Sequence, residues 1–78
     1  MMQKTDVLKE QLLNRIHQVR QDLFNDPSDL APLHDLHRNY PFNSNIESAH
    51  QLMMNHSYDD ETLTCIYMSE YLYWKDHH

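Results

Sequence analysis

Apolar side chains recur along the first third of the chain at the spacing of an α-helix. Within residues 6–25 they fall at i, i+4, i+8, i+11 and i+15, which places them in a single stripe. That stripe consists of Leu8, Leu12, Ile16, Val19 and Leu23, with Leu13 and Phe24 beside it. Thr5 or Asp6 can accept the first free backbone N–H groups, and Pro27 keeps Asp26 out of the α region. The pattern therefore predicts an amphipathic helix over 6–25.

Two shorter helices are predicted over residues 29–39 and 45–55. Pro32 suits the first turn of the former, where no backbone N–H is needed. Ser44 and Glu47 form a capping box at the start of the latter. Because the chain has no glycine, we expect Asn55 to end that helix in a left-handed conformation. The side chains expected to face inward are Leu30, Leu33, Leu36, His37 and Tyr40 in one helix and Ile46, Ala49, Leu52 and Met53 in the other.

A fourth helix is predicted over 58–76, after a second capping signature at residues 57–60. Its segment 63–74 is apolar or aromatic on nearly every face. At about 100° per residue it carries three stripes: Leu63, Tyr67, Tyr71 and Trp74; Cys65, Met68 and Leu72; and Ile66 and Tyr73, interrupted by Glu70. A helix that is apolar all round has to be surrounded. We therefore expect it to lie at the centre of the fold or at a dimer interface.

These elements predict an all-α fold, a compact bundle of about four helices in which two are long and two are short. With 78 residues the chain forms a single domain over 1–78. Folding buries only roughly 60% of the unfolded surface at this length, so the core has a thin margin and association would widen it.

The charge is acidic and unevenly distributed. The formal net charge is −6. Residues 1–38 carry five Lys or Arg and six acids, whereas residues 39–78 carry one base and six acids. The second half would be repelled by a nucleic acid or an anionic membrane and attracted by a basic protein surface. No segment reaches the ~18 apolar residues of a membrane span, and the polar first residues do not predict a signal peptide. A single cysteine allows no internal disulfide. We therefore expect a cytoplasmic protein.

Enzymatic chemistry finds little support in these residues. The absence of glycine removes the common nucleotide-binding loops, so no cofactor is expected. Cys65 lies among apolar neighbours, so a buried thiol rather than a nucleophile is expected, and Ser44 and Ser57 are explained as caps. No catalytic residue is assigned, and we expect a protein that is not an enzyme.

The histidines raise the alternative of a metal-binding helical protein. His34 and His37 are three residues apart on one helix face, as are Glu47 and His50. If the two short helices packed antiparallel, these four side chains could approach a tetrahedral, zinc-like site. The competing interpretation is a set of surface and half-buried histidines with no metal.

The leading hypothesis is a non-enzymatic protein-interaction module. Tyrosine and tryptophan are enriched at interface hot spots, and an acidic rim suits docking onto a basic partner protein. The residues expected to contact a partner are Asp59, Asp60, Glu61, Leu63, Tyr67, Glu70, Tyr71 and Trp74, and residues 63–74 could also form a homodimer seam. A short, acidic, glycine-free helical chain resembles the accessory proteins of phages and plasmids, which include inhibitors, antitoxins and adaptors.

Overall fold

Helices are the only regular secondary structure in the part of the chain that the computed structural model describes, residues 3–41 and 45–77. Its helices are α1 (Lys4–Asn25), α2 (Ala31–Asn39), α3 (Ile46–Met54) and α4 (Asp60–His77). The prediction of an all-α fold is therefore confirmed.

The first two helices begin where side chains take up free backbone N–H groups. α1 begins at Lys4, earlier than predicted, and the Asp6 carboxylate accepts from the Gln3 backbone N–H at 3.3 Å. α2 begins later than predicted, after the Asp29 carboxylate accepts from the Ala31 N–H at 3.1 Å, and Pro32 lies in its first turn as expected. Local capping chemistry sets these boundaries more finely than hydrophobic periodicity does.

Caps differ from the prediction at both ends of α3. Asn45 is the N-cap, and its side chain accepts from the Ser48 N–H at 2.8 Å. The predicted capping box began at Ser44, which lies outside the described residues. Asn55 ends the helix with φ −82°, so the expectation of a left-handed cap is wrong. The Asn55 side chain instead accepts from the Ser57 N–H at 2.9 Å, which turns the chain toward α4 without a positive φ.

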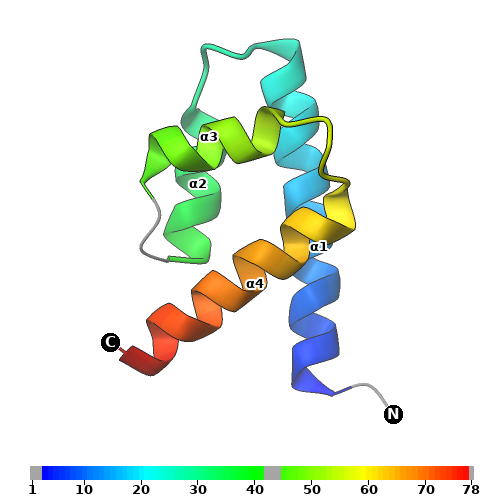
Figure 1. Ribbon diagram of the computed structural model, residues 1–78, viewed down its shortest axis with the longest axis vertical. Coiled ribbons are helices and arrows are strands. Elements are labelled where there is room, and N and C mark those ends of the chain that lie inside the picture. Colours follow the sequence, from blue (N-terminus) through cyan, green and yellow to red (C-terminus); the bar gives the residue numbers. More distant parts are fainter. Residues whose placement is uncertain (1–2, 42–44, 78) are drawn as a thin grey trace.

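α1 is the central element of the fold. It packs against each of the other three helices, and α2 also packs against α3. Figure 1 shows α4 crossing in front of α1 near the start of α4, after which the first turns of α1 and the last turns of α4 diverge. The C-terminal helix was expected at the centre or at a dimer interface. α1 takes the centre because it has the longer continuous apolar stripe, and the dimer interface stays a prediction.

The core forms along the stripe predicted for α1. Its apolar members are Leu12, Ile16, Val19 and Leu23 of α1, Leu33 and Leu36 of α2, Ala49 and Met53 of α3, and Leu63 and Tyr67 of α4. Thr64 is also fully buried, and its hydroxyl donates to the Asp60 carbonyl at 2.7 Å. Leu8 is only half-buried, because it lines a hollow between α1 and α4.

Candidate interaction surface

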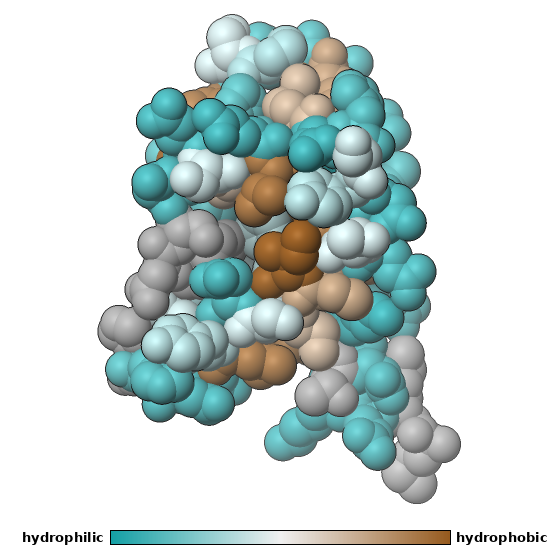
Figure 2. All heavy atoms as spheres, viewed as in Figure 1, coloured by the Kyte–Doolittle hydropathy of each residue, from teal (hydrophilic) through white to brown (hydrophobic). Residues whose placement is uncertain are grey.

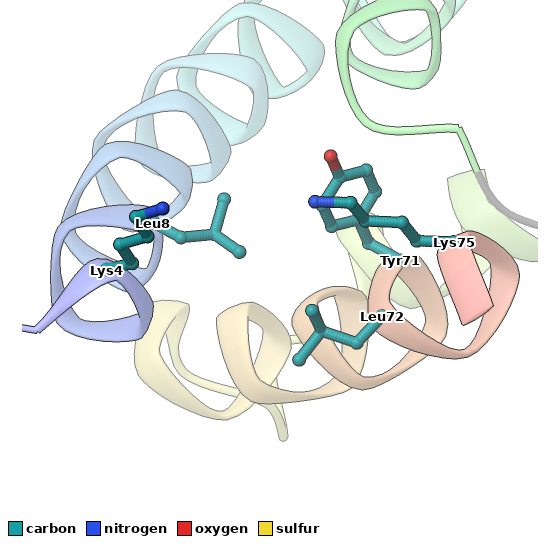
Figure 3. A pocket seen from close by; sticks show the side chains of 5 residues that line it. All are labelled: Lys4, Leu8, Tyr71, Leu72 and Lys75. Atoms are coloured by element: carbon teal, nitrogen blue, oxygen red, sulfur yellow. The ribbon is translucent and has the colours of Figure 1, made fainter.

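A hollow lies between the beginning of α1 and the end of α4. It has a volume of about 270 Å³ and is lined by Lys4, Leu8, Tyr71, Leu72 and Lys75. Figure 3 shows Lys4 and Leu8 reaching into it from α1, opposite Tyr71 and Lys75 of α4. The hollow therefore combines apolar side chains with two ammonium groups that come from different helices.

A second hollow continues along α4. It has a volume of about 240 Å³ and is lined by Lys9, Cys65, Met68, Ser69 and Leu72. Leu72 lines both hollows, so the two adjoin each other. We call the residues of both hollows the α4 groove. Leu8, Cys65, Met68, Tyr71 and Leu72 supply its apolar part, and the cations at its edge are Lys4, Lys9 and Lys75.

The α4 groove exists because α4 fully buries only one of its apolar stripes, whereas Met68 of the second stripe is partly buried against the core. Leu63, Thr64 and Tyr67 face the core. Cys65 lies on the other side of the helix and is exposed, so the expectation of a buried thiol is wrong. Figure 2 shows apolar atoms running down the middle of the molecular face that α4 crosses.

The aromatic residues predicted to bind a partner are divided between the core and the surface. Leu63 and Tyr67 are buried in the core, which places them out of reach of a partner, and burial raises the pKa of the Tyr67 phenol. Tyr71 is half-buried in edge-to-face contact with Tyr40, with ring centroids 5.7 Å apart. Glu70 and Trp74 are half-buried.

Tyr73 lies more openly than any of these aromatic residues. It is 56% exposed and stacks on the His77 ring at a centroid distance of 4.0 Å. It was not among the residues predicted to bind a partner, although the helix wheel had placed it on the stripe of Ile66.

The acidic start of α4 is largely engaged within the chain. Asp59 caps the helix by accepting from the Thr62 N–H at 2.7 Å, and hydrogen bonding to the Thr62 side chain and backbone lowers the pKa of its carboxyl group. Asp60 accepts from Arg20 at 2.9 Å and contacts the His17 ring at 2.6 Å. Partial burial opposes ionisation of Asp60, but the hydrogen bonds from His17 and Arg20 outweigh it, so its pKa is lowered.

Glu61 is the most available acid of this turn. Its carboxylate lies 3.3 Å from the ammonium group of Lys9, and its side chain is 69% exposed. Such an exposed pair is worth about 0–1 kcal/mol, so Glu61 can exchange Lys9 for another cation at little cost.

The four residues of the metal hypothesis do not form a site. His34 and Glu47 are exposed, whereas His37 and His50 are half-buried. Among residues 3–41 and 45–77, no three His, Cys, Asp or Glu side chains lie so that they could hold a metal ion. The His37 ring instead packs against Tyr67 at 5.8 Å, and burial, followed by the nearby His34, lowers its pKa.

Sequence reasoning missed the part of the groove that α1 supplies. Lys4 and Leu8 are four residues apart and therefore share a helix face. Leu8 is also the first member of the apolar stripe of α1. This shared face could have indicated that the apolar stripe of α1 ends beside the Lys4 ammonium group. The divergence of α1 from α4, however, depends on how the helices pack, and the spacing of apolar residues does not predict it.

Comparison of the chain with known protein families, with curated proteins and with solved structures gives no significant match. Within the described residues, no helix is long and apolar enough to cross a membrane. A functional assignment therefore depends on the chemistry of the surface.

Proposed function

We propose that this protein is a small, non-enzymatic protein-interaction module that docks through the α4 groove. The observation that carries the proposal is the apolar stripe of α4 that its own chain covers only in part. Cys65 is exposed, and Met68 and Leu72 are half-buried beside the hollows. Continuous apolar surface with a polar edge is typical of a site that another protein covers.

The shape of the α4 groove favours a helix or an extended segment as the docking element. Its two adjoining hollows run along α4 and are each of a size to take side chains from a partner. An amphipathic helix that lays its apolar face into such a groove uses residues spaced three and four apart as anchors. The lysines at the edge favour acidic residues beside those anchors.

The overall charge favours a partner whose surface is basic outside that docking element. The formal net charge of −6 acts over the whole surface and guides the first encounter, whereas Lys4, Lys9 and Lys75 act only at the groove. We propose that the protein acts by covering a functional surface of this partner, as small phage or plasmid inhibitors, antitoxins and adaptors do.

The test changes exposed residues of the groove and leaves the core intact. We would compare wild-type protein with a Cys65→Glu/Ser69→Glu variant, since both positions are exposed and line the groove. A Gln21→Glu/Gln51→Glu variant is the matched control, because it adds the same charge at exposed positions outside the groove. Circular dichroism would first establish that all three proteins are folded.

Tagged forms of the three proteins would be expressed at native level in the source cells, and any captured partner would then be purified and titrated. We expect a partner that binds the wild type and the control with equal affinity, and the groove variant at least tenfold more weakly. Equal binding by all three proteins, or no specific partner for any of them, would overturn the proposal.

A further inference from the structure

We propose that a second copy of this chain fills the α4 groove, in a symmetric dimer whose two α4 helices run antiparallel and cross at Met68. The inference rests on the proposed function, because it takes the α4 groove to be an interface, and the second copy would compete there with the partner of the proposed function. A second copy fits because the open face of α4 is complementary to itself.

The open face of α4 has the spacing of a helix–helix seam. Glu61, Cys65, Met68, Leu72 and Lys75 are separated by four, three, four and three residues. Alternating steps of four and three keep side chains on one line of a helix, as in coiled coils. The seam has an apolar middle of Cys65, Met68 and Leu72 and one charge of each sign at its ends.

This seam is symmetric about Met68. Glu61 lies seven residues before it and Lys75 lies seven residues after it, which is almost two turns in each direction. In an antiparallel pair that crosses at Met68, Glu61 of each copy faces Lys75 of the other. Cys65 of each copy lies within about one residue of Leu72 of the other. A two-fold interface forms each of these contacts twice.

The charges near the groove favour this arrangement. Within the described residues, neither Lys4 nor Lys75 forms an ion pair with its own chain, and both line the hollow at the end of α4. Among residues 3–41 and 45–77, the one ion pair of Glu61 is the exposed pair with Lys9. The antiparallel dimer brings the acidic start of one α4 to the lysines at the end of the other.

The size of the molecule limits how tightly the dimer can associate. A stable dimer buries about 1,200–2,000 Å² in total, so each copy must bury roughly a seventh of its own surface, which measures 5237 Å². α4 has 18 residues and is therefore about 27 Å long, in a molecule of 37 × 28 × 21 Å. A seam along α4 with contributions from Leu8 and Lys4 reaches the lower end of that range, so we expect a dissociation constant on the order of micromolar.

Cysteine crosslinking tests the register. In a Cys65→Ser background, Met68→Cys places a thiol next to its own symmetry mate, whereas Gln21→Cys places one at an exposed position of α1 outside the seam. We expect mild oxidation to give a disulfide dimer for Met68→Cys at least tenfold faster than for Gln21→Cys. Wild-type Cys65 should crosslink more slowly than Met68→Cys, because its symmetry mate is about 9 Å away along the helix axis. Equal rates at positions 65 and 68 would indicate a parallel seam and overturn the inference.

Exchanging the terminal charges tests the pairing. Glu61→Lys and Lys75→Glu, taken singly, should each weaken dimerisation about tenfold in sedimentation equilibrium, because each places like charges opposite one another in both symmetric contacts. The double variant restores opposite charges and should return to within about threefold of the wild type. A double variant as weak as the single variants would overturn the pairing.

The experiments distinguish failure of the dimer from failure of the proposed docking function. Purified protein that stays monomeric at millimolar concentration, yet loses a foreign partner on changing Cys65 and Ser69, would overturn the dimer and leave the proposed docking function intact. A dimer with the predicted crosslink in a protein that captures no partner would support the dimer and overturn the docking function.

Discussion

Replacing Arg20 with methionine would remove the side chain that ties the connection between α3 and α4 to α1. Arg20 is 6% exposed. Its Nε donates to the Met53 carbonyl at 3.0 Å, one terminal nitrogen donates to the Asn55 carbonyl at 3.1 Å, and the other donates to the Asp60 carboxylate at 2.9 Å. These three acceptors lie at the end of α3, in the connection and at the start of α4.

The expected cost follows from what each acceptor loses. Methionine keeps much of the apolar stem, so the change reports mainly on the hydrogen bonds. The Met53 carbonyl loses a charged donor, worth about 1.5–3 kcal/mol. The Asn55 carbonyl keeps the Tyr58 N–H at 3.2 Å and loses less. The Asp60 side chain is 31% exposed, so its ion pair adds about 1 kcal/mol or less. Together we expect a loss of about 2–4 kcal/mol.

Urea unfolding followed by circular dichroism would measure this loss as a lower midpoint at an unchanged m-value. Arg38→Met is the matched control, since Arg38 is 78% exposed and lies 3.6 Å from Asp35, so we expect less than about 0.5 kcal/mol there. Total stability at this length is roughly 4–12 kcal/mol, so the loss in the Arg20 variant would be a substantial part of it. A loss below about 1 kcal/mol for Arg20→Met would refute the reasoning, because the buried carbonyls would then have other donors.

Three further predictions concern other parts of the fold. Burial, together with the charge of His34, lowers the pKa of His37 below 6.5, so the unfolded chain binds more protons than the folded one. The urea midpoint should therefore fall as the pH drops from about 7 to 5, and His37→Gln should make the midpoint less dependent on pH. Asn45→Ala removes the cap on the Ser48 N–H and should cost about 1 kcal/mol in the same assay, and a cost near zero would contradict the capping role. Cys65 should react fully with a thiol reagent in native protein at low micromolar concentration, and a requirement for denaturant would show that it is buried.

Periodicity was sufficient to predict the helices but not their first residues. α1 ends at Asn25 as predicted, because Pro27 restricts the residue before it. The starts of α3 and α4 were misplaced because several polar residues in succession can each cap a helix. At α3 the structure uses Asn45, and at α4 it uses Asp59 rather than Ser57. Which candidate caps depends on backbone geometry, and that is set by packing.

The buried side of α4 could not be predicted from its own sequence. Three apolar stripes of similar quality leave the rotation of the helix about its axis undetermined. Polar contacts from elsewhere resolve it. The helix is rotated so that Thr64 is buried in place of an apolar residue of another stripe, and so that the Asp60 carboxylate reaches Arg20. Periodicity contains neither fact, because burial of Arg20 becomes favourable only when the connection supplies its acceptors.

This rotation explains why the opposite stripe stays open. Turning α4 to bury Met68 and Leu72 would carry Tyr67 out of the core and separate Asp60 from Arg20. That would leave the buried guanidinium without its carboxylate, which is unfavourable. A monomer can therefore fully cover one apolar side of α4 but not both, and small movements of α2 and α3 would not change this. We therefore expect another chain to cover the remaining side. Its alternating steps of four and three residues, with an acid at one end and a lysine at the other, match a second copy of itself.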